Sequence, residues 1–173
     1  MKRSHIRSLA RVALGTALLC LSAFLTVPFP PIPFTVQSYA LLAVCGLLGA
    51  KRGLAATLLY LALGAVGLPV FSGFGGGLGA LLGPTGGFLL GFLFVPLLCF
   101  FTEKRGMGAL ALGFALALLL SYAAGSLWYC FLFAEGEGFL STLTVTVLPF
   151  LLPDAVKLAL ALFTVKRLKR FVI

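Results

Sequence analysis

The chain has 173 residues, of which 61% are hydrophobic and 10% are charged, and its mean hydropathy is +1.17. This composition is typical of integral membrane proteins and excludes an ordinary water-soluble domain. A net charge of +9 would favour a nucleic-acid partner in a soluble protein. Here the basic residues lie in short clusters between apolar segments, so no nucleic-acid partner is expected.

Six apolar segments follow one another along the chain, and each helix that crosses a bilayer needs about 20 residues. We therefore predict an all-α integral membrane protein with six transmembrane helices in a single domain over residues 1–173. The first segment runs on to Val27 without a cleavage pattern, which indicates an uncleaved span and not a signal peptide. The second and third segments are short, which favours tilted or partial helices around a cavity. The segments cover approximately residues 9–27, 38–50, 53–69, 86–102, 107–132 and 143–166.

Basic residues mark one side of the membrane. Six crossings place all four basic clusters on the same side, which the positive-inside rule identifies as cytoplasmic. Both termini of this multi-pass protein are therefore expected on the cytoplasmic side of the cell membrane. The outer connections carry Glu135 and Glu137 as their only charged residues, and of the 13 Lys and Arg residues Lys157 alone lies outside the clusters. The clusters are Lys2, Arg3, Arg7 and Arg11; Lys51 and Arg52; Lys104 and Arg105; and Lys166, Arg167, Lys169 and Arg170.

Two of the outer loops have an unusual composition. The loop at 27–37 has four prolines between positions 28 and 33, which favours an extended polyproline-like path. The loop at 67–87 is rich in glycine, which permits a close approach of the backbone to a ligand or a helix. Both loops are apolar, so we expect them to fold over the outer mouth of the bundle and to cover a ligand pocket.

Asp154 and Lys157 form the most informative pair in the chain. A charge inside hydrocarbon costs at least about 2.5–3.5 kcal/mol, so such a residue is usually kept for pairing or for function. Their i, i+3 spacing places both on one helix face, and Pro153 is expected at the first helical position with Asp154 in the first turn. Two interpretations remain open: an ion pair that locks two helices, or a ligand site reached from outside.

Small residues recur at helical spacing in two spans. Gly87 and Gly91 form one such pair, and Ala13 and Ala17 form another, and both pairs favour close helix packing.

Catalysis has no support, because no HExxH, GxSxG or Gly-Lys-Ser/Thr sequence is present. The four cysteines and the single histidine lack metal-ligand spacing. We therefore predict neither an enzyme nor a metal or cofactor site, and ATP hydrolysis would have to come from partner subunits.

Several segments, in order, resemble BioY, the family of biotin-specific S components of energy-coupling factor (ECF) transporters. The resemblance implies a six-helix S-component bundle, a biotin site near the outer face, and coupling to a transmembrane T subunit and two ATPases. In this family such a subunit captures biotin from outside for vitamin uptake. The matching segments are 28–37 (PFPPIPFTVQ), 51–53 (KRG), 64–71 (GAVGLPVF), 83–92 (GPTGGFLLGF) and 148–157 (LPFLLPDAVK).

The resemblance also implies residue roles. Asp154 and Lys157 match the acidic and basic pair that engages the biotin head group, and Ala13 and Ala17 match small residues that dock onto the T subunit. Phe88 stands where the family commonly has Tyr, and Pro153 where Gly often precedes the Asp. The chain has no asparagine, so any family contact made by Asn is absent, and the receptor of the biotin carboxylate stays unassigned. The further ligand-binding candidates are Thr35, Gln37, Thr85, Gly86, Gly87 and Phe88.

Alternative functions remain open from the sequence. One is an S component for a different vitamin, and another is a non-transporting membrane scaffold in which Asp154 and Lys157 only lock helices together. An intramembrane enzyme is a more distant alternative.

Overall fold

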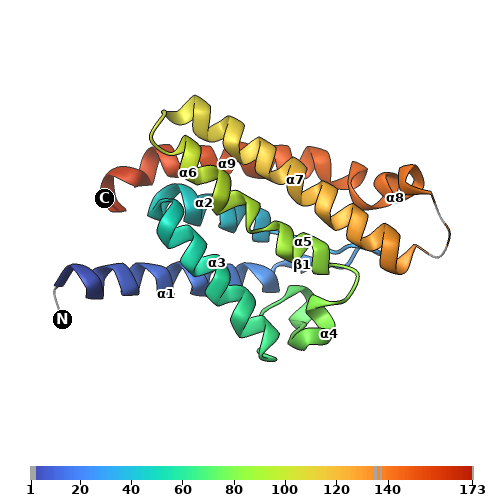
Figure 1. Ribbon diagram of the computed structural model, residues 1–173. Coiled ribbons are helices and arrows are strands. Elements are labelled where there is room, and N and C mark those ends of the chain that lie inside the picture. The colour runs from blue at the N-terminus through green and yellow to red at the C-terminus, as the bar shows by residue number, and fades with distance from the viewer. Residues whose placement is uncertain (1–2, 135, 137, 173) are drawn as a thin grey trace.

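The computed structural model describes residues 3–134, 136 and 138–172, and this part of the chain is a bundle of helices with one short hairpin (Figure 1). All six predicted apolar segments are helical, which confirms the predicted all-α membrane architecture. The expectations for Lys2, Glu135 and Glu137 fall outside the described residues.

The helices differ in length much as the apolar segments do. Three of them are long and apolar enough to cross a bilayer, namely His5–Phe24, Met107–Phe133 and Leu148–Phe171, whereas Gln37–Leu48 and the stretch Gly86–Thr102 are shorter apolar helices. Many of their large apolar side chains are exposed and would form aggregating patches in water, as expected of a surface that faces lipid. The six segments form α1 (Arg3–Phe24), α2 (Gln37–Leu48), α3 (Ala50–Ala65), α5 with α6 (Gly86–Gly91, Phe94–Thr102), α7 (Met107–Phe133), and α8 with α9 (Phe139–Thr146, Leu148–Val172).

The fourth predicted span is divided into α5 and α6. Pro96 has no N–H, and Val95 N donates to Phe92 O at 3.2 Å, so the chain tightens at this point. The carbonyl of Gly91 then loses its usual helical partner and accepts instead from Ser121 Oγ at 2.7 Å. A side chain of α7 thus satisfies a backbone group that lipid could not satisfy.

The start of the last helix differs from the prediction. Pro153 lies inside α9 and not at its first helical position, and Asp154 lies nearly two turns from the helix start. The interruption falls at Val147, between α8 and α9. Pro149 explains the difference, because it occupies the first turn of α9, where a missing N–H leaves no hydrogen bond unmade.

Helix α2 forms the centre of the bundle, since most of its residues are buried and it contacts α1, α3, α6 and α9. Gly46 allows the closest approach: a Cβ at this position would lie 2.5 Å from Val165 Cγ2 of α9. This packing fixes the first turn of α2 beside the middle of α9, where Lys157 lies.

The basic clusters come together at one end of the bundle. Both termini and the α6–α7 turn lie at the same end in Figure 1. Two contacts join the α2–α3 junction to this end: Ala50 N donates to Glu103 Oε2 at 2.7 Å, and Arg52 Nε donates to Ser8 Oγ at 3.2 Å. The arrangement agrees with the prediction that the clusters share one side of the membrane.

The two unusual loops lie at the opposite end, with α8. The first loop forms an antiparallel hairpin of β1 (Thr26–Val27) and β2 (Phe34–Thr35), not a uniform polyproline path. The glycine-rich loop folds into a short 3-10 helix, η1 (Ser72–Phe74), and helix α4 (Gly77–Leu81). The ring of Phe74 stacks on Phe24 at the end of α1, with ring centroids 5.0 Å apart. The loops therefore pack onto the bundle, as predicted.

Replacing Gly87 with Ala is expected to destabilise the bundle. An added Cβ would lie 2.3 Å from Trp128 Cβ and 2.9 Å from the carbonyl oxygen of Ala124, so α5 would have to move away from α7. Overpacking of this kind costs about 1–3 kcal/mol or more, which should lower the melting temperature of the detergent-solubilised protein. Gly79→Ala is the matched control, because an added Cβ there meets nothing within 4 Å. Equal melting temperatures for the two variants would contradict the proposed close packing.

Candidate functional site

A cavity lies beneath the two loops, and the space within it and its open mouth together amounts to about 730 Å³. Its walls come from loop 27–37, η1 and helices α2, α5, α6, α7, α8 and α9. Most of the lining surface is apolar, and the polar side chains of Ser38 and Tyr122 lie beside the Asp154–Lys157 pair. The lining residues are Ile32, Pro33, Thr35, Gln37, Ser38, Leu41, Ser72, Thr85, Phe88, Leu89, Phe92, Val95, Leu118, Ser121, Tyr122, Thr146, Phe150, Asp154 and Lys157.

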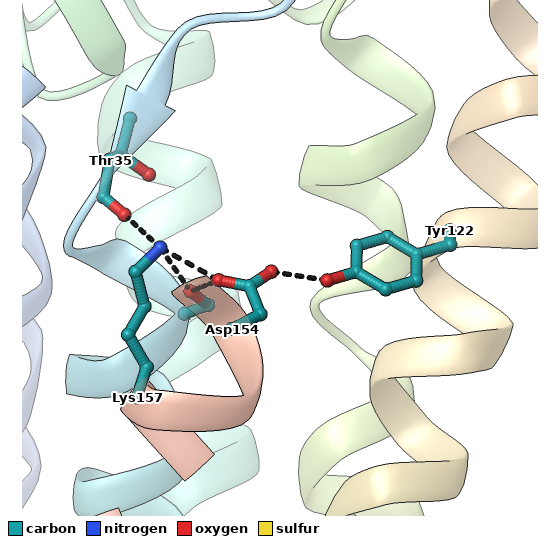
Figure 2. A network of polar contacts seen from close by, with 5 residues as sticks. Thr35, Tyr122, Asp154 and Lys157 are labelled. Atoms are coloured by element: carbon teal, nitrogen blue, oxygen red, sulfur yellow. Dashed lines mark hydrogen bonds and ion pairs between the residues drawn. The ribbon is translucent and has the colours of Figure 1, made fainter. Parts of the chain in front are cut away.

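Asp154 and Lys157 form an ion pair inside this cavity. Both side chains are buried on one face of α9, and Lys157 Nζ lies 2.7 Å from Asp154 Oδ1. Figure 2 shows Lys157 and Tyr122 approaching the Asp154 carboxylate from opposite sides. A buried pair is stable only when hydrogen bonds satisfy its remaining polar atoms, and the surrounding residues supply these bonds.

The Lys157 ammonium group has an acceptor for each of its three N–H groups. Besides Asp154 Oδ1, it donates to the backbone carbonyl of Thr35 at 2.6 Å and to Ser38 Oγ at 3.2 Å. Its nitrogen also lies 4.0 Å from the centre of the Phe34 ring, which adds a cation–π contact. A ligand carbonyl can therefore reach this ammonium only by replacing a contact that the protein already makes.

The Asp154 carboxylate is held from two further helices. Ser38 Oγ of α2 donates to Oδ1 at 2.9 Å, and Tyr122 OH of α7 donates to Oδ2 at 2.5 Å. Oδ1 thus has two donors, whereas Oδ2 has one from the described residues. Because a carboxylate oxygen accepts two hydrogen bonds readily, Oδ2 keeps capacity for a donor on a ligand.

The other predicted site residues divide into two groups. Thr35, Gln37, Thr85 and Phe88 line the cavity together with the ion pair. Gly86 and Gly87 do not line it and are buried against neighbouring backbone and the Trp128 side chain. Phe88 is held by α7, because its ring covers Gly125, where an added Cβ would lie 2.4 Å from the ring.

Sequence reasoning missed Ser38 and Tyr122, although both contact Asp154. Tyr122 gave a usable signal, since it is a hydroxyl-bearing residue in the middle of the apolar run 107–132. Ser38 follows Gln37 directly, but a lone serine near a helix start is too common to indicate a site.

In the described part of the chain, no group of three His, Cys, Asp or Glu residues is placed to hold a metal ion.

The fold and the cavity define an integral membrane protein that can hold a small molecule with both polar and apolar parts. The chain belongs to the BioY family, whose family model matches residues 1–173. It is 36% identical over 163 residues to a probable biotin transporter BioY of Pyrococcus horikoshii, an alignment that covers 94% of this chain and 96% of that protein. It is 33% identical over 181 residues to the biotin transporter BioY of Thermotoga maritima, covering 95% and 97%.

A solved structure has the same fold. The S-component for biotin from an ECF-type ABC transporter superposes with a TM-score of 0.88 at 29% sequence identity, covering 98% of this chain and 94% of that one. The predicted S-component-like architecture is therefore confirmed over nearly the whole chain.

Removing one charge of the pair should lower the melting temperature of the protein more than removing both charges. Lys157→Met leaves the Asp154 carboxylate buried without its cation, and breaking a buried pair in this way costs about 3–5 kcal/mol. The double variant Asp154→Asn/Lys157→Met removes both charges and should recover most of the lost melting temperature. A double variant that is as unstable as Lys157→Met would contradict this account of the pair.

Proposed function

We propose that this protein is the substrate-binding S component for biotin uptake, which captures biotin at the outer face of the membrane and releases it inward when coupled to energising subunits. Family membership and the fold shared with a biotin S-component support this proposal. The observation that supports a particular binding site is the Asp154–Lys157 pair, because side chains from two other helices hold it in a largely apolar cavity.

The head group of biotin fits the polar end of the cavity. A ureido ring offers one carbonyl acceptor and two N–H donors, and the pair offers an ammonium and a carboxylate. The ligand carbonyl can replace the Lys157–Ser38 contact, the longest of the three made by the ammonium at 3.2 Å. Ser38 would keep its bond to Asp154 Oδ1, while Asp154 Oδ2 accepts one ligand N–H.

The apolar part of biotin fits the rest of the cavity. Its thiophane ring and valeryl chain need apolar surroundings, which Leu89, Phe92 and Phe150 provide, with Phe88 and Thr85 nearer the start of α5. Gly86 and Gly87 contribute indirectly in this proposal. Gly87 lets α5 approach α7 closely, and Gly86 lets the start of α5 lie against the Leu81 carbonyl. This packing would position Thr85 and Phe88 along the cavity wall.

Transport against a gradient requires partners. The chain has no Gly-Lys-Ser/Thr sequence, so two ATPase subunits and a T subunit would supply the energy, and the S component itself is not an enzyme. We place both termini in the cytoplasm, because the basic clusters come together at the end of the bundle opposite α4 and α8 (Figure 1).

The exposed face of α1 is the proposed docking surface for the T subunit. Ala13 and Ala17 are both exposed and lie one turn apart, whereas Gly15, Thr16 and Leu19 face the bundle. Small side chains on an exposed helix face let a second helix approach closely in a membrane. The remaining surface of α1 carries larger apolar residues such as Leu14 and Leu18.

Biotin binding tests the proposed site directly. Intact cells, which expose only the outer face, should bind labelled biotin when they express the wild-type protein. Asp154→Asn and Lys157→Ala should each weaken binding at least about tenfold, since truncating one partner of a buried charge pair costs 2 kcal/mol or more. The double variant Asp154→Asn/Lys157→Met should fold and still fail to bind. Wild-type affinity in that double variant would show that the pair only locks helices together.

Larger side chains on α1 should separate docking from binding. Ala13→Leu/Ala17→Leu should leave biotin affinity unchanged but reduce copurification with coexpressed T and ATPase subunits, because the added bulk keeps the helices apart. Ala155→Leu/Ala159→Leu is the matched control, with the same spacing and exposure on α9. Equal copurification of both double variants would exclude the α1 face as the docking surface.

A further inference from the structure

Gln37 is the one amide side chain in the cavity wall, and a residue outside the cavity holds it in place. Gln37 is 3% exposed, and its Nε2 donates to the hydroxyl of Tyr60 at 2.5 Å. Tyr60 lies on α3, is fully buried and does not line the cavity. The hydrogen bond therefore joins the cavity wall to a neighbouring helix.

This bond leaves the other end of the amide open. The terminal group of Gln consists of an NH2 donor and a carbonyl acceptor on opposite sides of one carbon. With Nε2 directed at Tyr60, the Gln37 Oε1 atom accepts no hydrogen bond from the described residues. Among the described residues, no fully buried side-chain nitrogen or oxygen lacks a hydrogen-bond partner, so the unpartnered Oε1 atom is accessible. Gln37 thus offers an acceptor to a molecule in the cavity.

The Tyr60 ring is itself fixed by the glycine-rich loop. Phe71 packs edge-on against it, with ring centroids 5.5 Å apart and an interplanar angle of 77°. Phe71 in turn lies directly over Gly64 of α3, where an added Cβ would be 2.1 Å from its ring. Both rings are buried and in contact, which restricts the movement of the Tyr60 hydroxyl that holds Gln37.

We propose that Tyr60 is a positioning residue for ligand selection, which turns the Gln37 amide so that Oε1 accepts the second N–H of a cyclic urea. This inference rests on the proposed function and adds the third contact to the ureido group. The carbonyl binds Lys157, one N–H binds Asp154 Oδ2 and the other binds Gln37 Oε1. Ser38, the next residue after Gln37 in α2, donates to the other oxygen of the same carboxylate, Asp154 Oδ1.

Tyr60→Phe isolates this role, because it removes the hydroxyl and keeps the ring against Phe71. Purified wild type, Tyr60→Phe, Gln37→Ala and the double variant should be titrated with biotin and with its two cyclic carbamate analogues, in each of which oxygen replaces one ring N–H. Tyr60→Phe should weaken biotin binding about three- to tenfold, the range expected for one net hydrogen bond. Adding it to Gln37→Ala should cause no further loss. Tyr39→Phe is the matched control, since its hydroxyl bonds Thr164 at 3.0 Å between α2 and α9, outside the cavity.

The analogues separate positioning from a general loss of stability. In wild type, one analogue loses the N–H that faces Asp154 and the other loses the N–H that faces Gln37. Tyr60→Phe and Gln37→Ala should both reduce the difference in affinity between biotin and the second analogue. Neither variant should change the difference in affinity between biotin and the first analogue. A uniform weakening of biotin and both analogues, or unchanged affinity for all three, would overturn the role of Tyr60 while the proposed function stands. Failure of the wild type to bind biotin would instead overturn the proposed function.

Discussion

The charged pair on α9 is the constraint on which the rest of the structure depends. An ammonium and a carboxylate in hydrocarbon are tolerated only when each is neutralised by the other and hydrogen bonds satisfy their remaining atoms. Four groups outside α9 meet this condition: the Thr35 carbonyl, the Phe34 ring, Ser38 and Tyr122. They come from β2, α2 and α7, so one pair determines where three separate elements must lie.

The same requirement explains the position of α2. Its first turn can supply Ser38 only if α2 lies directly against α9, and Gly46 permits this by removing a side chain at the closest approach to Val165. Burial of nearly the whole of α2 follows, since α1, α3 and α6 cover its other faces. The hairpin is held to the bundle by Lys157 through Thr35, which keeps the first loop over the cavity.

The sequence was sufficient for features that depend on the bilayer, because hydrocarbon penalises charge and unpaired backbone strongly. The apolar segments, the basic clusters and the misplaced Lys157 could all be identified without coordinates.

Features that depend on tertiary contacts could not be predicted from the sequence. Ser38 and Tyr122 resemble ordinary polar residues until α2 and α7 are placed beside α9. The break at Val147 was misassigned because Pro149 and Pro153 compete as helix starts, and local sequence does not rank them. Gly86 and Gly87 are close in sequence to Thr85 and Phe88, yet neither lines the cavity: Gly87 lies against α7, and Gly86 lies against the carbonyl of Leu81.

A site whose charges are already satisfied can stay folded before its ligand arrives, and this limits how it can select one. In the proposed binding mode a ligand carbonyl replaces the Ser38 contact of Lys157, so the new contact would add little net free energy. Discrimination must come from acceptors that the protein leaves open, which are Asp154 Oδ2 and Gln37 Oε1. A ligand that lacks the matching N–H groups would enclose these oxygens without making those hydrogen bonds, and sites of this kind reject such analogues strongly. Selectivity would therefore depend on Tyr122 and Tyr60, which contact the two acceptor groups, as well as on the charge of the pair.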